Sequence, residues 1–308
     1  MKEVKVLICD PIDEVGVKLL REAGYHVDLK TEITAPDLVK VAGTYDALVV
    51  RSRTKITKEV LQAGKPKLKI VARSGVGLDN VDTEAAKALS IQVVNSAEAP
   101  SNAVAELVLG YMFSLSRNIS KGDASMKRGE WAKSRLTGFE LSGKTMGIVG
   151  FGRIGFLVGK KMKSLGMRVL CYDVLIDKMM NFVQEAGAES VPLDKLLAES
   201  DFVTVHVPLL PQTKYLFNAA TIAKMKKGSY IINAARGGII EEKALVDALN
   251  SGHLAGAALD VYEEEPTKNM DLIKMENVVC TPHIGAESKE AQLGNSTIVA
   301  EKLIEVLG

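Results

Sequence analysis

The sequence predicts an α/β protein made of two doubly wound domains, each with a parallel sheet. Three observations support this prediction. Short apolar runs alternate with helical patterns along nearly the whole chain. A glycine-rich turn near residue 150 stands between an apolar run and a helical pattern. A long helical pattern, from Ser101 to about Met126, separates the alternation into two parts. Alternation of this kind is typical of a parallel sheet covered by helices.

The first part of the chain begins with an apolar run, "VKVLIC" at residues 4–9, which predicts a strand. The segment "DEVGVKLLREAG" at residues 13–24 has helical periodicity and is closed by Gly24. The same patterns predict further strands at residues 46–50, 69–73 and 91–94, and helices at residues 57–64 and 81–89.

The second part restarts the alternation at "TMGIVGFG". Its apolar runs predict strands at residues 145–152, 168–173, 201–207, 229–235, 255–261 and 277–282, and a final helix covers about 287–307. The chain has no repeat of 20–50 residues and no low-complexity segment. We therefore expect two doubly wound units, the second beginning near residue 97.

The bulk composition narrows the function classes. A length of 308 residues fits about two domains, and 47% apolar with 25% charged residues is ordinary for a soluble globular protein. A net charge of +1 gives no overall attraction to nucleic acid or to a membrane surface. The longest apolar stretch, "AVAELVLGYMFSL", is too short for a membrane span. We expect neither nucleic acid nor membrane as a partner.

The cysteines and the first residues of the chain indicate the cellular compartment of the protein. Cys9, Cys171 and Cys280 lie far apart in sequence and form no CxxC motif, so we expect no metal site and no disulfide framework. This pattern fits the reducing cytoplasm. The opening "MKEVKVLICDP" is typical of a strand and not of a signal peptide.

The glycine-rich turn "GIVGFGRIG" contains Gly150, Gly152 and Gly155 in the spacing G-x-G-x-x-G. A predicted strand enters the turn and a predicted helix leaves it, which is the context of a dinucleotide site. Open N–H groups at the helix start can face a pyrophosphate. A second strand ends at Asp173, 18 residues past Gly155, where an acid can accept the ribose hydroxyls. No arginine follows at residues 174–176 to bind a 2′-phosphate, so NAD is favoured over NADP.

Seven segments spread over nearly the whole chain give the sequence a family resemblance. They are "VVRSRTKIT" (49–57), "GVGLDNVD" (75–82), "LSGKTMGIVGFGRIG" (141–155), "TVHVPLLPQT" (204–213), "NAARGGIIEEKAL" (233–245), "AGAALDVYEEEP" (255–266) and "TPHIGAESKEAQ" (281–292). With these segments the chain resembles the D-isomer-specific 2-hydroxyacid dehydrogenases. Within that family it is most similar to the members that oxidise D-3-phosphoglycerate.

The resemblance implies a layout and a catalytic trio. Residues 1–96 and 287–308 are expected to form a discontinuous, flavodoxin-like substrate domain, and residues 97–286 an inserted Rossmann NAD-binding domain, with a cleft between them. The trio falls on Arg236, Glu265 and His283. The resemblance also implies a homodimer, formed through the long helix and the stretch before the glycine turn.

The trio makes chemical sense for oxidising an alcohol. NAD takes the hydride, and a histidine such as His283 suits the removal of the proton near neutral pH. A carboxylate such as Glu265 fixes the tautomer of the ring and stabilises its charged form. An arginine such as Arg236 grips a carboxylate and polarises the reacting oxygen. Taken singly, these side chains are an ordinary surface arginine, a solvated acid and a structural histidine; their joint order favours catalysis.

Positive side chains at the end of one predicted strand bear on the charge of the substrate. Period-two geometry predicts that Arg51 and Arg53 share one face, continued by Lys55, and a phosphate between the two guanidinium groups would relieve their repulsion. A solvated basic edge is the alternative interpretation. The segment 73–77 offers backbone N–H groups for the substrate carboxylate. Near Trp131, Lys133 and Arg135 are expected to reach across a dimer.

The full set of predicted binding residues follows from the motifs and the resemblance. Substrate contacts are expected from Arg51, Arg53, Ser74, Gly75, Arg236 and His283. Cofactor contacts are expected from Val76, Gly150, Gly152, Arg153, Ile154, Gly155, Asp173, His206, Val207, Pro208, Ala234, Ala235, Arg236, Asp260, His283, Gly285 and Ala286. The ring of His206 has no acidic partner nearby in sequence, and we expect it to be structural.

The expected function is NAD-dependent oxidation of 3-phosphoglycerate to 3-phosphohydroxypyruvate, which opens the phosphorylated route to serine. Two alternatives stay open: a glyoxylate or hydroxypyruvate reductase on the same scaffold, and an NAD(H)-sensing corepressor-like binding protein. Because the chain stops at Gly308, directly after its closing helix, we expect no C-terminal regulatory domain.

Overall fold

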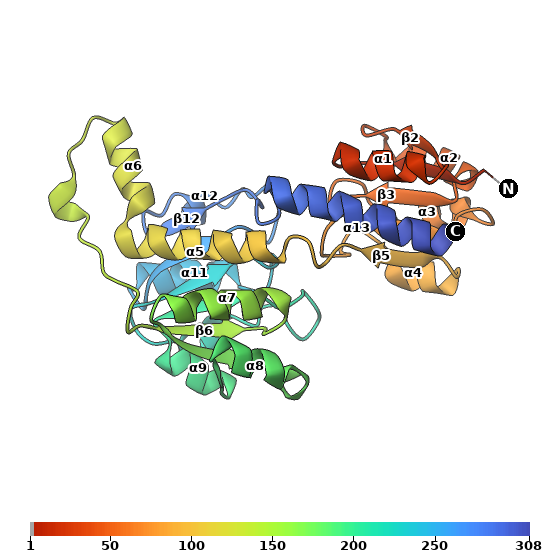
Figure 1. The fold of residues 1–308 in the computed structure, drawn as a ribbon. Coiled ribbons are helices and arrows are strands. Elements are labelled where there is room, and N and C mark those ends of the chain that lie inside the picture. The colour runs from red at the N-terminus through yellow and green to blue at the C-terminus, as the bar shows by residue number, and fades with distance from the viewer. Residues whose placement is uncertain (1–2) are drawn as a thin grey trace. The chain divides into compact units, whose positions relative to one another are not determined.

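The computed structural model describes residues 3–308, which divide into two compact units (Figure 1). Unit 1 comprises residues up to Ala103 together with Ala286–Gly308, and unit 2 comprises Val104–Gly285. Unit 2 is thus inserted into the sequence of unit 1. The boundary expected from the sequence lies after residue 96, whereas unit 2 begins inside helix α5 (Ser101–Arg117).

Unit 1 contains a five-stranded sheet in which every neighbouring pair is parallel. The strand order 2-1-3-4-5 is that of flavodoxin-like folds. Across the sheet the strands are β2 (His26–Leu29), β1 (Lys5–Ile8), β3 (Ala47–Val50), β4 (Ile70–Arg73) and β5 (Gln92–Asn95). The helices are α1 (Glu14–Glu22), α2 (Ala35–Val41), α3 (Lys58–Gly64), α4 (Thr83–Ala88) and α13 (Lys289–Leu307), with a 3₁₀ turn η1 (Ala42–Thr44).

Helix α13 returns from the end of the chain to complete the core of unit 1. Its apolar residues Val299, Ala300 and Leu303 are fully buried, together with the β1 residues Val6 and Ile8. The alternate β1 residues belong to the core on the opposite face of the sheet, under α2 and α3. A Cβ at position 16 would lie 2.7 Å from a backbone oxygen of α13, so α1 needs its glycine to approach that helix.

Unit 2 contains a seven-stranded parallel sheet whose order corresponds to the Rossmann arrangement 3-2-1-4-5-6 with one strand added. Its strands, in sheet order, are β12 (Val278–Cys280), β11 (Leu254–Leu259), β10 (Ser229–Asn233), β9 (Phe202–Val205), β6 (Thr145–Val149), β7 (Arg168–Tyr172) and β8 (Glu189–Ser190). The order reverses between β6 and β9, and ligands of open α/β sheets bind at such a reversal.

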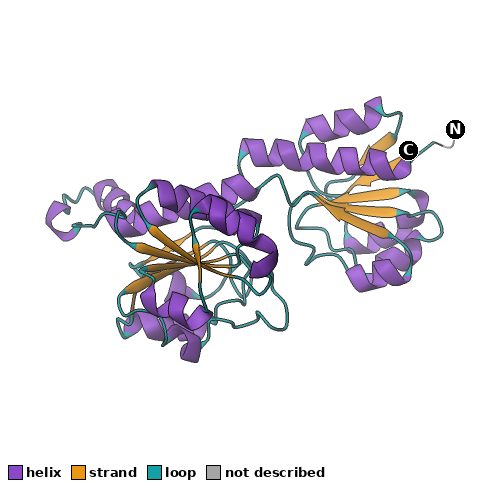
Figure 2. Ribbon diagram, turned by 60° about the horizontal axis from the view of Figure 1, so that its bottom comes forward, coloured by secondary structure: helices purple, strands orange, loops and turns teal. Residues whose placement is uncertain are grey.

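The helices of unit 2 cover both faces of its sheet (Figure 2). They are α5, α6 (Ile119–Lys127), α7 (Arg153–Ser164), α8 (Met180–Ala186), α9 (Leu193–Glu199), α10 (Ala219–Ile222), α11 (Glu242–Asn250) and α12 (Met270–Ile273), with 3₁₀ turns η2 (Lys133–Arg135) and η3 (Ile176–Met179). One core packs α5 and α7 on the sheet, and the other packs α9 and α11 on the opposite face. The predicted fold class, two doubly wound parallel-sheet domains, is confirmed.

The long helix predicted over residues 101–126 is two helices, so that prediction is wrong in detail. Helix α5 ends at Arg117 and α6 begins at Ile119. Between them Asn118 has a left-handed backbone with φ 55°, a conformation that asparagine tolerates better than most residues. The periodicity of apolar residues continues through this residue, so the sequence pattern alone does not reveal the break.

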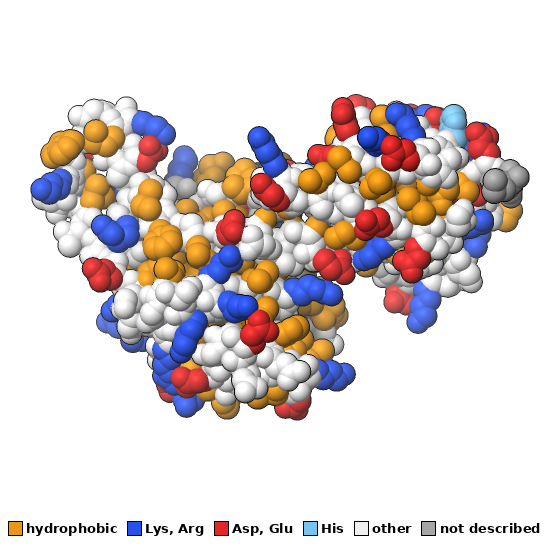
Figure 3. Space-filling view, viewed as in Figure 1, with side chains coloured by type: hydrophobic (Ala, Val, Ile, Leu, Met, Phe, Trp, Pro, Cys, Tyr) orange, Lys and Arg blue, Asp and Glu red, His pale blue; other side chains and the backbone are white. Residues whose placement is uncertain are grey.

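The surface carries both signs of charge over the face drawn in Figure 3. Apolar side chains gather where Figure 1 places α6 and the following loop, and the exposed residues of this segment include Ile119, Met126 and Trp131. No helix within residues 3–308 combines the length and the apolar character needed to cross a membrane.

Candidate active site

The glycine-rich turn joins β6 to α7 in unit 2. Gly150 has φ +94°, and a Cβ there would lie 2.6 Å from the carbonyl oxygen of His206. A Cβ at Gly155 would lie 2.2 Å from the oxygen of Gly150, so the helix packs against the turn only with glycine. A Cβ at Gly152 would meet nothing within 4 Å. Since no side chain caps the first turn of α7, its N–H groups suit an anion such as a pyrophosphate.

The acid predicted to bind ribose stands beside this turn. The carboxylate of Asp173, just after β7, accepts hydrogen bonds from the backbone N–H groups of Phe151 at 2.9 Å and Leu175 at 2.8 Å. The side chains that follow are exposed and apolar, with Val174 83% and Leu175 50% exposed. Turn, helix start and oriented carboxylate together fit the pyrophosphate and adenosine ribose of a dinucleotide.

His206 lies at the end of β9, with its backbone against the glycine turn. Its N–H donates to the Val149 carbonyl at 2.7 Å, and its Nε2 lies 3.0 Å from the Thr204 hydroxyl. The buried Nδ1 has no hydrogen-bond partner within residues 3–308. Desolvation lowers the pKa of His206 to about 3, so the ring is neutral at physiological pH.

His283 and Glu265 form a hydrogen-bonded pair. The Nδ1 of His283 lies 2.7 Å from Oε2 of Glu265, and the other carboxylate oxygen accepts the N–H of Tyr262 at 3.1 Å. Burial raises the pKa of Glu265, but the hydrogen bond and charge of His283, the Tyr262 N–H and the charge of Arg236 outweigh it, so the net pKa is lowered. Both side chains remain partly exposed, at 46% and 38%. With Nδ1 engaged, Nε2 is the nitrogen left to meet a substrate.

The loop that carries His283 is anchored by Asp260, which is 1% exposed. The Asp260 carbonyl accepts the N–H of His283 at 2.8 Å. Its carboxylate accepts the N–H groups of Ile284 at 2.8 Å and Gly285 at 2.7 Å, and a short hydrogen bond from Thr281. His283 has φ +54°, a left-handed conformation that costs about 1 kcal/mol or more for a residue other than glycine. Asp260 therefore holds the loop in a conformation that the chain would not adopt alone.

Arg236 lies in the loop after β10, next to the loop after β11. The side chain of Asn233 fixes the start of this loop, donating to the Arg236 carbonyl at 2.9 Å and accepting from Ala235 at 3.0 Å. A Cβ at Gly237 would lie 1.7 Å from the oxygen of Tyr262, so the two loops touch through glycine. This contact brings the positive charge of Arg236 close enough to Glu265 to lower the pKa of that carboxylate.

A cavity of about 540 Å³ borders the His283–Glu265 pair. Its lining is mostly apolar and consists of Tyr262, Glu265, Pro266, Thr267, Ile273, Cys280, Thr281, Pro282 and His283.

The predicted residues Ala234 and Ala235 directly precede Arg236, and Val207 and Pro208 directly follow His206. Every predicted catalytic residue thus lies in unit 2, on loops that follow its strands.

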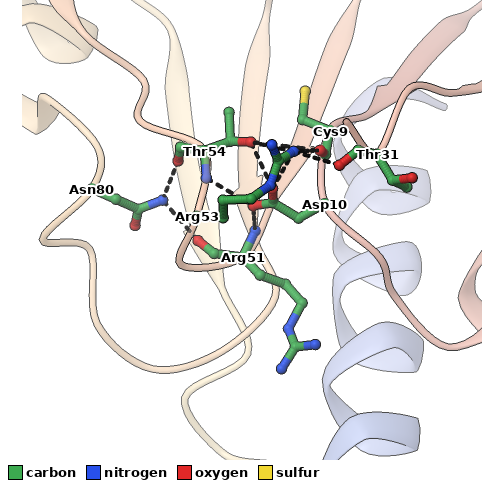
Figure 4. A network of polar contacts seen from close by, with 7 residues as sticks. All are labelled: Cys9, Asp10, Thr31, Arg51, Arg53, Thr54 and Asn80. Atoms are coloured by element: carbon green, nitrogen blue, oxygen red, sulfur yellow. Dashed lines mark hydrogen bonds and ion pairs between the residues drawn. The ribbon is translucent and has the colours of Figure 1, made fainter. Parts of the chain in front are cut away.

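The structure departs from the expectation that Arg51 and Arg53 share one face. Strand β3 ends at Val50, so period-two alternation does not extend over residues 51–55. The guanidinium of Arg53 turns back into unit 1, where it donates to the Asp10 carboxylate at 3.1 Å and to the carbonyls of Cys9 at 2.7 Å and Thr31 at 2.5 Å (Figure 4). Arg53 is therefore a structural clamp between chain segments, and the side chain of Arg51 points away from it.

Asp10 is the centre of this network, and the sequence analysis did not identify it. Its carboxylate accepts the N–H of Arg51 at 2.6 Å, the N–H of Thr54 at 3.2 Å and the Thr54 hydroxyl at 2.6 Å. Asn80 donates to the carbonyls of Arg51 at 2.7 Å and Thr54 at 2.6 Å. The backbone of Arg51 is thus fixed from both sides while its side chain stays outside the network (Figure 4).

The predicted carboxylate donors at residues 74–77 are partly engaged within unit 1. The N–H of Ser74 donates to the Val50 carbonyl at 2.8 Å, and the N–H of Gly75 donates to the Ser96 hydroxyl at 2.7 Å. These two amides are therefore not available as the expected donors. The carbonyl of Val76 accepts from the side chain of Asn95 at 2.5 Å.

Arg73 is a further residue that the sequence analysis did not identify as part of the site. It ends β4 and pairs in register with Val50, the residue before Arg51. Its guanidinium lies against Gly75, where a Cβ would come within 1.5 Å of Nη1. The rule that parallel strands end at one edge could have identified it, because "KIVAR" ends in this arginine.

The segment with Trp131, Lys133 and Arg135 extends beyond the core of unit 2. Trp131 is 80% exposed, and Arg135 lies 3.4 Å from the carboxylate of Glu130. None of these three residues belongs to either hydrophobic core of unit 2.

Comparison with known proteins places these features in a family. The family described as "D-isomer specific 2-hydroxyacid dehydrogenase, NAD binding domain" matches residues 109–285. A D-3-phosphoglycerate dehydrogenase of Methanocaldococcus jannaschii is 46% identical over 305 residues, which are 99% of this chain and 57% of that protein. The chain thus spans little more than half the length of that relative.

Two solved structures extend the comparison. A glyoxylate reductase from Paecilomyes thermophila is 29% identical with a TM-score of 0.88, covering 98% of this chain and 95% of the other. A formate dehydrogenase from Staphylococcus aureus, solved in complex with NAD, is 30% identical with a TM-score of 0.86, covering 99% of this chain and 96% of the other.

Proposed function

Because the chain belongs to the D-isomer specific 2-hydroxyacid dehydrogenase family, whose matched domain binds NAD, we propose that it oxidises D-3-phosphoglycerate to 3-phosphohydroxypyruvate. The observation that carries the proposal is the pair of His283 Nδ1 and Glu265 Oε2 at 2.7 Å, in the unit that contains the glycine turn. The 46% identity to a D-3-phosphoglycerate dehydrogenase favours this substrate over unphosphorylated hydroxy acids.

The proposed proton path runs through the second nitrogen of His283. Nε2 takes the proton of the substrate hydroxyl during oxidation and returns it to the carbonyl oxygen during reduction. Glu265 keeps Nδ1 engaged and stabilises the positive ring that forms. The charge of Arg236 binds the substrate carboxylate and polarises the reacting oxygen. NAD, when bound, accepts the hydride from the substrate carbon.

We propose that unit 2 holds the dinucleotide through the turn Gly150–Gly155 and the start of α7. The Asp173 carboxylate binds the adenosine ribose. A 2′-phosphate there would meet this carboxylate and the exposed apolar side chains of Val174 and Leu175 instead of a cation. The enzyme therefore prefers NAD to NADP.

We propose that unit 1 supplies the charge that recognises the substrate phosphate. Arg51 directly follows β3 and Arg73 ends the neighbouring strand β4, and Arg51 presents its side chain from a fixed backbone. A phosphate monoester carries close to two negative charges at pH 7 and suits a pair of guanidinium groups. Arg53 contributes indirectly, through Asp10, to the position of Arg51.

The test of this function is a spectrophotometric assay of NADH consumption against a panel of 2-keto acids. The panel includes 3-phosphohydroxypyruvate, hydroxypyruvate, glyoxylate and pyruvate. We expect the highest kcat/KM for 3-phosphohydroxypyruvate and almost none for any member with His283→Ala. A higher kcat/KM for glyoxylate or hydroxypyruvate would replace the proposed substrate. Tight NADH binding without turnover of any member would indicate a binding protein instead.

We also propose a homodimer built on the segment from α6 to Trp131. Three large apolar side chains, Ile119, Met126 and Trp131, are at least half exposed there, which is unusual for a free surface. Light scattering coupled to gel filtration tests this with Trp131→Ala and Met126→Ser combined. A wild type of twice the chain mass and a smaller variant are expected, and a monomeric wild type would refute the proposal.

We propose the cytoplasm as the working compartment. The three cysteines are free thiols, and Cys9 and Cys171 are buried, as suits a reducing environment. Fractionation of the source cells with an antibody against the chain tests this, and recovery outside the cytosolic fraction would contradict it.

A further inference from the structure

Arg51 already has an anionic partner within unit 1. Its Nη2 lies 2.5 Å from Oε1 of Glu287, a residue placed just before helix α13. The arginine side chain is 25% exposed and the glutamate 48%. The second oxygen of Glu287 accepts the side-chain N–H of Gln292 at 3.1 Å, and the same amide donates to the Ala286 carbonyl at 2.9 Å. Both oxygens of this carboxylate are therefore engaged.

The two sides of this ion pair differ in exposure, 25% for Arg51 and 48% for Glu287. The backbone of Arg51 is fixed by Asp10 and Asn80, so only its side chain can change partner. Glu287 directly precedes Ser288, the N-cap residue of α13, and its side chain is half exposed. Water can take the place of the arginine around the carboxylate if the arginine turns to another anion.

We propose that Glu287 is the resident counter-ion of Arg51 and that the phosphate of the substrate displaces it. This inference rests on the proposed function, because it assumes that Arg51 meets the phosphate. A phosphate has nearly twice the charge of a carboxylate and three acceptor oxygens, so it binds the Arg51 guanidinium in preference to Glu287. The competition nevertheless raises the KM for phosphorylated substrates. A substrate with a neutral hydroxymethyl end leaves the pair intact, and Glu287 does not affect its binding. Glu287 thereby sets how strongly the enzyme prefers phosphate.

The test compares Glu287→Gln with a matched control, Glu290→Gln. Both variants remove one negative charge near the start of α13, and Glu290 is exposed and outside the proposed site. Steady-state kinetics are measured with 3-phosphohydroxypyruvate and with hydroxypyruvate. Exposed ion pairs are worth about 0.2–1 kcal/mol, so Glu287→Gln is expected to lower the KM for the phosphorylated substrate about 1.4- to 5-fold. Its KM for hydroxypyruvate and the constants of Glu290→Gln are expected to stay near wild type.

A second arm isolates the pair itself. In an Arg51→Ala background, Glu287→Gln is expected to leave the KM for 3-phosphohydroxypyruvate unchanged, because the contested guanidinium is gone. Equal decreases in KM for both substrates, an increase for the phosphorylated one, or the same decrease in Glu290→Gln would each overturn the proposal.

An anion-binding measurement separates this inference from the proposed function. If the wild type does not reduce 3-phosphohydroxypyruvate, the proposed function fails, but the counter-ion can still be tested with inorganic phosphate. Thermal stabilisation by phosphate, at constant ionic strength with chloride, is expected to reach half its maximum at a lower concentration in Glu287→Gln than in Glu290→Gln. Equal midpoints in the two variants would overturn the counter-ion role.

Discussion

The carboxyl ends of the two parallel sheets have the same geometry but different chemistry. In unit 2 this edge gathers the glycine turn, Asp173, Arg236 and the His283–Glu265 pair. In unit 1 the corresponding edge gathers Asp10 and three arginines, at positions 51, 53 and 73. One edge carries the pair that we propose moves a proton, and the other carries arginines, of which Arg53 is held by Asp10 and Arg51 is proposed to meet the substrate. The comparison teaches that a fold determines where side chains converge, while their type determines what the edge does.

The two edges also use buried carboxylates in the same way. Asp260 in unit 2 anchors the loop of His283, and Asp10 in unit 1 anchors the backbone of Arg51. Neither acid is more than 1% exposed. In both units, a buried acid fixes the backbone of a residue whose own side chain is more exposed, His283 in unit 2 and Arg51 in unit 1.

The largest expected effect comes from removing the proposed proton carrier of unit 2. His283→Ala is expected to lower kcat/KM about a thousand-fold, because general acid–base catalysis contributes on the order of 10²–10⁴. The matched control is His26→Ala, which removes an exposed histidine of unit 1 and is expected to leave the rate unchanged. A loss of less than ten-fold in His283→Ala would exclude this residue as the proton carrier.

Arg51 and Arg53 of unit 1 are expected to differ in role, the first in substrate binding and the second in stability. Arg51→Ala is expected to raise the KM for the phosphorylated substrate about 10- to 100-fold, the value of a lost charge-assisted hydrogen bond, with little change in Tm. Arg53→Ala is expected to destabilise unit 1 by about 1–3 kcal/mol, because Asp10 is left buried with an unmatched charge. Kinetics and thermal unfolding of both variants check this. The reverse pattern would restore Arg53 as the phosphate ligand.

The pH dependence of kcat/KM tests the role of Glu265. Its pKa is lowered, so the carboxylate stays ionised throughout the neutral range and stabilises a positive His283 ring. Glu265→Gln removes this stabilisation, so the acidic limb of kcat/KM for the oxidation is expected to move to lower pH. An unmoved limb would mean that the pair does not govern the titration.

The same lowered pKa has a consequence for stability. The contribution of ionised Glu265 to folding is fully present above the ordinary carboxyl pKa and is lost as the pH falls through its lowered value. In Glu265→Gln this part of the acid sensitivity is expected to disappear, as measured by urea unfolding at pH 7 and at pH 3–4.

The smallest expected effect concerns the cofactor edge of unit 2. Asp173→Asn is expected to raise the KM for NAD several-fold and to reduce the preference for NAD over NADP, because the charge that repels a 2′-phosphate is gone. Initial rates with both cofactors measure this. An unaltered ratio of kcat/KM between them would show that Asp173 does not select the cofactor.

The sequence supported the fold and the arrangement of unit 2 far better than the details of unit 1. The glycine turn and Asp173 are separated by a fixed strand–helix–strand distance, so their proximity follows from local pattern. The pairing of His283 with Glu265 came from resemblance, not from periodicity. The direction of Arg53 could not be predicted, because it depends on Asp10, which lies just after β1 and 43 positions earlier in the chain. The break at Asn118 and the pairing of Glu287 with Arg51 likewise depend on contacts that no local pattern records.

The return of α13 to unit 1 has a consequence for biosynthesis. While the ribosome releases the chain from its first residue onward, β1–β5 emerge long before Val299, Ala300 and Leu303, which cover one face of their sheet. Unit 2 is contiguous and can mature as soon as it leaves the exit tunnel. Until α13 emerges, that face of unit 1 is covered only in part, by α1. Chaperone demand during translation is therefore expected to fall on the first hundred residues.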